Sequence, residues 1–183
     1  MKFCSNCASP VNLSIPPGDN RPRFCCPQCH AIHYQNPKMV LGTIPVLGER
    51  VLLCKRAIEP RYGFWTLPAG FMENGETTEQ GACRETLEEA GARVKLLAPF
   101  SIIDVAHVDQ IHMFFVAQML HDDFEPGTES LEVKLFAEAQ IPWQEIAFRT
   151  VSQTLRWFFA DRAQYGSDAL SDGSKIRLHT TSI

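Results

Sequence analysis

The sequence predicts an α+β protein in which a small four-cysteine metal-binding module precedes a larger sandwich domain built on a mixed β-sheet. Three observations support this prediction. The cysteines are concentrated near the N-terminus, whereas the rest of the chain alternates β-prone runs with two segments of helical periodicity. The 183 residues, 45% hydrophobic and 21% charged, suit one domain of ordinary globular composition with a small module attached.

The composition argues against several classes of partner. Lys and Arg number 17 and Asp and Glu number 21, so the net charge of −4 is not that of a polybasic nucleic-acid binder. No apolar run approaches the roughly 20 residues of a membrane helix. The first ten residues, MKFCSNCASP, lack the apolar core of a signal peptide. We therefore expect a cytoplasmic protein with no nucleic-acid or membrane partner and with reduced cysteines.

Residues 1–35 are predicted to form a zinc ribbon. The pairs Cys4-x-x-Cys7 and Cys26-x-x-Cys29 have the spacing of a four-cysteine zinc site, and the segment between them is rich in loop-forming residues. So short a stretch does not bury a core of its own, and zinc contributes an apparent ~10–16 kcal/mol to small zinc domains. Four thiolates close the coordination shell, so we expect a structural zinc.

Other interpretations of these cysteines stay open. The run CPQCH at residues 26–30 also matches the haem-attachment pattern CxxCH, although haem would leave Cys4 and Cys7 unexplained. The thiols could alternatively be redox-active. Cys25 is adjacent to Cys26, and Cys26 is the preferred ligand because it gives the two-residue spacing.

Residues 36–165 are predicted to form the larger domain, and residues 166–183 a flexible C-terminal tail. Strands are expected over residues 38–46, 51–54, 62–67, 94–97, 102–107, 110–120 and 133–136. Helical periodicity predicts helices over residues 78–90 and 145–163. Thr77 or Thr78 is expected to cap the first helix, and Gly91 to end it.

The helix predicted over residues 78–90 carries a cluster of carboxylates. Glu85, Glu88 and Glu89 cover only about 100° of its circumference. At ~6 Å and an effective dielectric of ~20, each pair repels by roughly 2–3 kcal/mol. A hard divalent cation, Mg²⁺ or Mn²⁺, relieves this repulsion, although a fully solvated acidic face would also accommodate the three glutamates.

The segment that includes this helix resembles the Nudix box, G-x5-E-x7-R-E-U-x-E-E-x-G-U, in which U is a bulky aliphatic residue. The fixed positions of the box are occupied by Gly70, Glu76, Arg84, Glu85, Glu88, Glu89 and Gly91. Two U positions carry the small residues Thr86 and Ala92. The resemblance covers roughly residues 38–160 and implies an α/β/α sandwich around a mixed sheet.

The resemblance also implies a reaction, the metal-dependent hydrolysis of the pyrophosphate bond of a nucleoside diphosphate linked to another group X. The implied ligands of Mg²⁺ or Mn²⁺ are Glu85, Glu88, Glu89 and the Gly70 carbonyl. Arg84 and Glu76 would orient the helix carboxylates and complete the implied catalytic set with Glu85 and Glu89. Metal ions would neutralise developing charge and activate the attacking water.

Members of this family differ in the catalytic base, which is a box glutamate in some and a glutamate on a later loop in others. The stretch PGTESLE at residues 126–132 is rich in turn-forming residues and precedes a predicted strand. Glu129 and Glu132 are both candidates for a base or metal-binding role, and Glu132 is included in the predicted catalytic set. Either could instead be an ordinary surface charge.

A zinc ribbon before a Nudix domain resembles the NADH pyrophosphatases. Those enzymes carry the signature S-Q-P-W-P-F-P-x-S after the box, where this chain has APFSIIDVA at residues 98–106. A closer resemblance is to FAD and ADP-ribose pyrophosphatases of the plant chloroplast type and their bacterial relatives. It rests on RYGFWTLPAGF at residues 61–71, on ESLE at 129–132 and on Leu135-Phe136.

The closer resemblance implies cleavage of FAD to FMN and AMP, with ADP-ribose as a further substrate, by an enzyme that forms homodimers. NADH pyrophosphatase-like activity is the alternative. A nucleotide-sensing module without hydrolysis is an alternative of another class, although every acidic position of the box is present.

Candidate substrate-binding residues flank the box. Arg61 is a candidate phosphate ligand, and Phe64, Trp65 and Phe71 are candidates for stacking on adenine or flavin, as is Tyr34. Trp65 would equally suit a core position, because it lies in a predicted strand.

Overall fold

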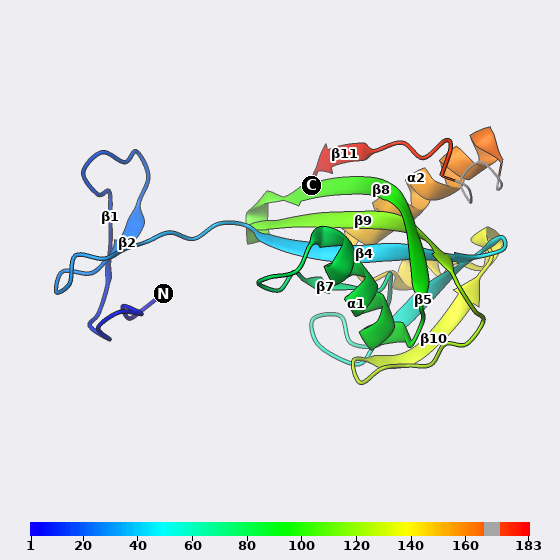
Figure 1. The fold of residues 1–183 in the computed structure, drawn as a ribbon, viewed down its shortest axis with the longest axis horizontal. Helices are drawn as coiled ribbons and strands as arrows, with labels where there is room; N and C mark the ends of the chain where they lie inside the picture. The colour runs from blue at the N-terminus through cyan, green and yellow to red at the C-terminus, as the bar shows by residue number, and fades with distance from the viewer. Residues whose placement is uncertain (167–172) are drawn as a thin grey trace. The chain divides into compact units, whose positions relative to one another are not determined.

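The computed structural model describes residues 1–166 and 173–183 and divides into two compact units, Met1–Pro37 and Lys38–Ile183 (Figure 1). The first unit contains the antiparallel strands β1 (Asn12–Ser14), β2 (Arg23–Cys25) and β3 (Ile32–His33). Strands this short do not enclose a hydrophobic core. The unit therefore depends on its cysteines, which are described with the site below.

The second unit holds the long strands and both α-helices. Its elements are β4 (Lys38–Leu47), β5 (Arg50–Arg56), β6 (Trp65–Thr66), β7 (Ala69–Phe71), α1 (Thr78–Ala90), β8 (Val94–Val105), β9 (Gln110–Met119), β10 (Ser130–Phe136), α2 (Arg149–Tyr165) and β11 (His179–Ser182). Short 3₁₀ turns lie at Ala106–Val108, Glu138–Gln140 and Trp143–Glu145. No helix in the described part of the chain is both long and apolar enough to cross a membrane.

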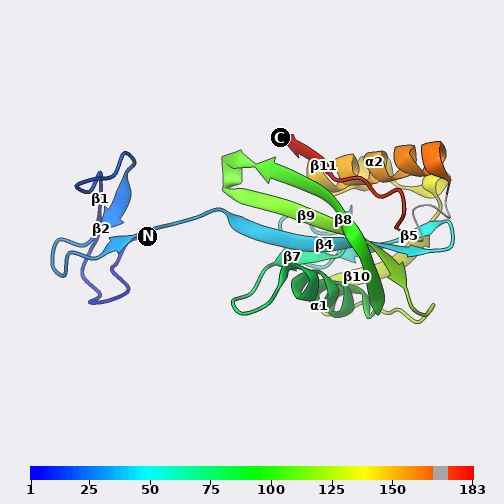
Figure 2. The same ribbon diagram turned by 45° about the horizontal axis from the view of Figure 1, so that its top comes forward.

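The long strands form a mixed sheet in the order β10-β5-β4-β9-β8-β11, with β6 beside β5 and β7 beside β4. The pairs β4–β9 and β8–β11 are parallel, and the other pairs are antiparallel. The helices α1 and α2 cover opposite faces of the sheet (Figure 2). The predicted α/β/α sandwich with a mixed sheet is thus confirmed.

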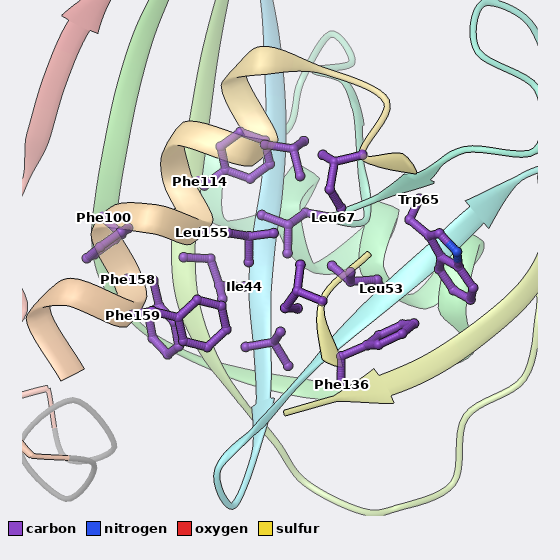
Figure 3. Packing of buried hydrophobic residues seen from close by; sticks show 14 of the residues in the cluster. Ile44, Leu53, Trp65, Leu67, Phe100, Phe114, Phe136, Leu155, Phe158 and Phe159 are labelled. Carbon is purple, nitrogen blue, oxygen red and sulfur yellow. The ribbon is translucent and has the colours of Figure 1, made fainter. Parts of the chain in front are cut away.

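Alternating side chains along the strands pack against the two helices in turn. On one face, Leu41 and Phe115 pack with Ala82 of α1. On the other face, residues of β4, β5 and β9 pack against α2 in a larger cluster, which includes Ile44, Leu53, Phe114, Leu155 and Phe158 (Figure 3). Burial on both faces fixes the register of each strand, because a one-residue slip would exchange the two sets of side chains.

Helix α1 begins and ends at the predicted residues. The Thr77 hydroxyl accepts a hydrogen bond from the Gln80 N–H, and the Gln80 side chain accepts one from the Thr77 N–H. Gly91 ends the helix at φ 62°, a left-handed conformation that favours glycine. The glutamates of the box are therefore displayed on a rigid helix rather than on a loop.

The structure corrects two strand predictions. A single strand, β8, replaces the two predicted over residues 94–97 and 102–107, because bulges accommodate the irregular stretch that includes Pro99. The strand predicted over residues 62–67 is reduced to the two residues of β6, Trp65–Thr66.

The prediction of a flexible C-terminal tail was wrong for the last residues of the chain. His179–Ser182 forms β11, which pairs in parallel with β8 from His179↔Ser101 to Ser182↔Asp104. The sequence HTTS has β-branched residues but no apolar run, so the pairing was not visible as a strand pattern. Residues 167–172 of the predicted tail lie outside the described part of the chain.

Candidate active site

The first unit gathers four thiols at one point. The sulfur atoms of Cys4 and Cys29 lie 3.6 Å apart, and those of Cys7 and Cys26 lie 3.5 Å apart. All four ligand atoms lie within 4.8 Å of one another. Tetrahedral zinc with Zn–S bonds of about 2.3 Å places its sulfur ligands about 3.8 Å apart. The geometry therefore fits a four-thiolate zinc site.

Cys25 lies outside this cluster. Its thiol on β2 faces backbone carbonyls, and the neighbouring Cys26 supplies the fourth ligand atom, as predicted. Cys26 and Cys29 share one cluster with Cys4 and Cys7, an arrangement that the haem-attachment interpretation leaves unexplained. His33 also approaches the site, with its Nε2 atom 3.3 Å from the Cys4 sulfur.

In the second unit, the side chain of Arg84 lies among the carboxylates of the box. Its Nε and Nη2 atoms donate to the two oxygens of Glu76 at 3.0 and 2.9 Å. Its Nη1 atom donates to Glu85 at 2.6 Å and to Glu88 at 3.1 Å, and Nη2 also donates to the Phe71 carbonyl. The guanidinium thus ties the loop before α1 to the acidic face of the helix.

Among these carboxylates, Glu76 receives two hydrogen bonds from Arg84, one on each oxygen. The hydrogen bonds from Arg84, with a further one from the Glu73 N–H, lower the pKa of Glu76 to about 2. The hydrogen bond to Glu76, with smaller contributions from Glu85 and Glu88, raises the pKa of Arg84. This pair keeps its charges over a wide pH range, and Arg84 also contacts Glu85 and Glu88 on the helix.

Glu85 and Glu89 are buried, with relative exposures of 9% and 7%. Burial raises the pKa of Glu85, opposed by Arg84. Burial also raises the pKa of Glu89 to about 8, opposed by a hydrogen bond from the Ala69 N–H. Among the described residues, Glu89 forms no ion pair, so its ionised form lacks the stabilisation that Arg84 gives Glu85.

Glycines bring the neighbouring chain close to these carboxylates. A Cβ atom at Gly70 would collide with the Glu85 carboxylate, so strand β7 runs directly past this side chain. A Cβ atom at Gly127 would collide with the Glu88 carbonyl. The loop before β10 therefore packs against the last turn of α1, and the Gly127 N–H donates to the Glu89 carbonyl at 3.1 Å.

A cavity of about 1100 Å³ opens over this site. It is lined by Glu85, Glu88 and Glu89, by Arg56 and Arg61, and by residues from β8, β9, the start of α2 and Ile183. This volume is slightly above the range for small-molecule sites, which are typically clefts of ~300–1,000 Å³.

The catalytic assignment of Glu132 is not favoured by its position. Glu132 lies exposed on β10, after a register shift that follows Ser130, and does not line the cavity. Glu129, just before the strand, does line the cavity, and its charge acts on both Glu85 and Glu89. The turn at Gly127 thus brings Glu129, and not Glu132, to the cavity.

The predicted substrate-binding residues fall into two groups. Arg61 and Phe71 line the cavity, and Phe71 is 48% exposed. Trp65 is buried in the core, where its ring meets that of Phe136 edge-on at 4.9 Å. Phe64 does not line the cavity either, and Tyr34 belongs to the first unit. Both residues of the short strand β6 are buried, and Trp65 belongs to the core cluster.

Other cavity residues were missed by the sequence analysis. Arg56 of β5 is 9% exposed; its Nε atom donates to the Pro60 carbonyl at 2.8 Å, and its guanidinium lies 5.1 Å from the centre of the Phe148 ring. Among the described residues, Arg56 has no carboxylate oxygen within ion-pair distance. Arg56 follows Lys55 at the end of the strand (RVLLCKR), so the sequence offered no signal that separates it from an ordinary surface charge.

His112 of β9 also lines the cavity without having been singled out as a site residue. Its ring nitrogens lie 3.0 Å from the Thr150 hydroxyl and 2.9 Å from the Gln110 amide oxygen. Burial lowers the pKa of His112 to about 4, so the ring is neutral near pH 7. It joins β9 to the start of α2 beneath the cavity.

The donors on α1 fit a hard divalent cation. The Glu85, Glu88 and Glu89 carboxylates and the Gly70 carbonyl are all oxygen ligands, the type that Mg²⁺ and Mn²⁺ prefer. The carboxylates of Glu85 and Glu88 already share the cationic Nη1 atom of Arg84. A metal ion would favour the ionised form of Glu89, which burial disfavours.

Comparison with known proteins agrees with this site. A family model described as Nudix N-terminal matches residues 2–35, and the NUDIX domain model matches residues 38–158. A crystal structure of a NUDIX hydrolase from Nitrosomonas europaea is 50% identical, with a TM-score of 0.90 and 100% of both chains covered.

Two kinds of relative with assigned names are also similar. An ADP-ribose pyrophosphatase of Methanocaldococcus jannaschii is 31% identical over 133 residues, which are 68% of this chain and 76% of that protein. The NAD-capped RNA hydrolase NudC of Photobacterium profundum is 32% identical over 139 residues, 75% of this chain and 50% of that protein. The chain spans about half the length of the NudC relatives that it matches first. With both models matched in order along its length, the chain belongs to the Nudix hydrolase family and carries the N-terminal zinc-ribbon module found in that family.

Proposed function

We propose that this protein is a divalent-metal-dependent pyrophosphohydrolase that cleaves a nucleoside diphosphate linked to a second group X. The observation that carries the proposal is the position of Arg84, which contacts Glu85 and Glu88 beside the buried Glu89 at the wall of a large cavity. A purely structural acidic helix face would be solvated, yet two of these glutamates are buried.

Each side chain has a role in this reaction. Glu85, Glu88, Glu89 and the Gly70 carbonyl would hold Mg²⁺ or Mn²⁺, which stabilises negative charge on phosphate oxygens and lowers the pKa of water. Glu129 accepts the proton of the attacking water. Arg56 and Arg61 bind the non-reacting phosphate oxygens.

The bond changes follow from this arrangement. Water oxygen attacks one phosphorus atom, the bond from that phosphorus to the bridging oxygen breaks, and the bridging oxygen leaves with the other phosphate. The products are two monophosphates. FAD would give FMN and AMP, and ADP-ribose would give AMP and ribose 5-phosphate.

FAD and ADP-ribose are the proposed substrates. The similarity to the Methanocaldococcus jannaschii ADP-ribose pyrophosphatase, of which the chain covers 76%, supports ADP-ribose. The exposed Phe71 ring at the cavity offers a stacking surface for a base or flavin. FAD rests on the sequence resemblance alone.

A second candidate is hydrolysis of NADH or of an NAD-capped RNA end. Several NudC relatives at 28–33% identity support it. An RNA substrate would overturn the prediction that this acidic chain has no nucleic-acid partner. The homodimer and the cytoplasmic location likewise stay predictions.

A product assay tests the proposal. Protein with Mg²⁺ or Mn²⁺ is incubated separately with FAD, ADP-ribose, NADH and an NAD-capped RNA, and the products are separated by chromatography. Glu88→Gln is the control, because Glu88 is exposed and its replacement leaves the core intact. We expect AMP from FAD or ADP-ribose and at least a ~100-fold loss in the control. Activity on NADH or capped RNA alone would favour the second candidate, and no hydrolysis by a folded protein would favour a nucleotide-sensing module.

A further inference from the structure

The C-terminal strand reaches the candidate active site. Beyond the parallel pairing of β11 with β8, the N–H of Ile183 donates to the Asp104 carbonyl at 2.9 Å, and the Ser182 hydroxyl donates to the Asp104 carboxylate at 3.3 Å. Ile183 then lines the same cavity as the glutamates of α1. Figure 1 shows β11 at the edge of the sheet beside β8.

Contacts with α2 and β8 hold this strand in place. The His179 Nε2 atom lies 2.8 Å from the carboxylate of Asp161, which is buried on α2. The His179 ring stacks on Trp157 at 4.9 Å and 14°, and its centre lies 5.0 Å from that of Phe100. An edge strand of four residues has only one partner strand, so this anchor fixes the position of Ile183.

The sheet order separates Ile183 from the arginine end of the cavity. Three strands, β4, β9 and β8, lie between β5, which carries Arg56, and β11. Arg56 and Ile183 therefore belong to strands that are not neighbours in the sheet. If the phosphates of a substrate lie near Arg56 and the glutamates, the part of the substrate that contacts Ile183 is one far from the phosphates.

The side chains that line the cavity from β8, β9 and β11 are partly apolar, and Arg149 at the start of α2 lines the cavity as well. Val105, Val108 and Ile183 are aliphatic, and none of the described lining residues from β8, β9, β11 or the turn between β8 and β9 is Asp, Glu, Lys or Arg. His112 is neutral near pH 7 because burial lowers its pKa. Such a surface suits a flat heteroaromatic ring rather than a phosphate.

We propose that Ile183, anchored through His179, is a specificity-determining residue that packs against a heteroaromatic ring of the nucleotide substrate. The inference rests on the proposed function, since it assumes that phosphates occupy the other end of the cavity. The ring is either adenine or the ring of group X. The two sources are distinguished by testing the two halves of FAD separately.

Equilibrium binding of AMP and of FMN tests this assignment without hydrolysis. Ile183→Asn introduces a polar side chain without a charge, and Thr180→Ala, an exposed position on the same strand, is the control. We expect Ile183→Asn to weaken one of the two ligands at least about tenfold, which is about 1.4 kcal/mol, with Thr180→Ala unchanged. The ligand that is weakened identifies the ring.

The positioning role of His179 has its own test. His179→Ala should reproduce the loss of affinity, and His179→Gln, which keeps a hydrogen-bonding group, should restore part of it. Equal affinity of the native protein and Ile183→Asn for both ligands would overturn the proposal, as would failure of the native protein to bind either. If the native protein binds AMP or FMN but hydrolyses none of the substrates in the product assay, the proposed function is contradicted and the role of Ile183 in binding is not.

Discussion

The hydroxyl groups of Thr43 and Thr86 lie 2.7 Å apart in the core, between strand β4 and helix α1. Thr86 also donates to the Ala82 carbonyl at 2.8 Å. Since each hydroxyl has one proton, Thr43 donates to Thr86. Both side chains are fully buried, so Thr86, which replaces the bulky aliphatic residue of the box, is matched by its partner on the sheet.

Replacing one of these threonines should destabilise the fold more than replacing both. Thr86→Val leaves the Thr43 proton buried without an acceptor, at a cost of about 1–3 kcal/mol. Adding Thr43→Val should recover most of this loss, because both polar groups are then absent. Urea unfolding of the single and double variants measures the coupling. Strictly additive effects would show that the hydrogen bond does not couple the two sites.

Glu89 should make stability depend on pH when no catalytic metal is present. Burial raises its pKa to about 8, so between the unfolded pKa near 4.5 and pH 8 the folded state binds more protons than the unfolded state. The contribution of Glu89 to the unfolding free energy therefore falls as pH rises through this window, by up to about 1.4 kcal/mol per pH unit.

Glu89→Gln removes this titration, and the exposed Glu88→Gln is the matched control. We expect the stability of Glu89→Gln relative to the native protein to increase from pH 5 to pH 8 in buffer without Mg²⁺. Thermal or urea unfolding at several pH values measures the difference. The same slope in both variants would contradict the assignment.

Glu129 should be the base and Glu132 should not. Removal of a general base typically costs ~10²–10⁴-fold in rate, so Glu129→Gln should lower kcat by at least about 100-fold with its fold unchanged. Glu132→Gln should keep turnover within about twofold, because Glu132 faces solvent on β10. The reverse ranking of the two variants in the product assay would restore the original assignment.

The fold was largely predictable because its signals are local. Thr77, Gly91 and the spacing of glutamates determine where α1 lies, and apolar runs determine β4, β5 and β9. The single strand β8 was missed because Pro99 usually interrupts a strand, and only tertiary pairing shows the bulges. The polar strand β11 has no local signal, since its order comes from β8, Asp161 and Trp157.

The site was predictable as far as the motif reached. Arg84 and the four glutamates of the box lie together because they belong to one helix and the loop before it. The choice between Glu129 and Glu132 depended on a register shift in β10 and on the close approach of Gly127 to α1. Such contacts join segments about 40 residues apart, and no pattern within a single sequence specifies them.

The adjacent cysteines Cys25 and Cys26 provide a matched test of the zinc site. Cys26→Ser removes a ligand atom from the cluster, so zinc measured by elemental analysis should fall from one ion per chain to near zero. Cys25→Ser should keep its zinc, because this thiol lies outside the cluster. Full zinc content in the purified Cys26→Ser protein would reject the four-thiolate assignment.

Arg56 should bind the substrate phosphates. Its side chain is nearly buried and keeps a positive charge at the cavity without a carboxylate partner among the described residues, so an incoming phosphate would gain a charge-assisted hydrogen bond. Arg56→Lys keeps the charge but loses the planar fork, and should raise KM by about tenfold.

Arg56→Met removes the charge as well as the planar fork and should raise KM further, because the incoming phosphate then loses its charge-assisted hydrogen bond. Arg50→Met, at an exposed position on the same strand, is the control and should leave KM unchanged. Because a loss of packing alone would lower the melting temperature without raising KM, an unchanged KM in Arg56→Met would assign Arg56 to the fold and not to the site.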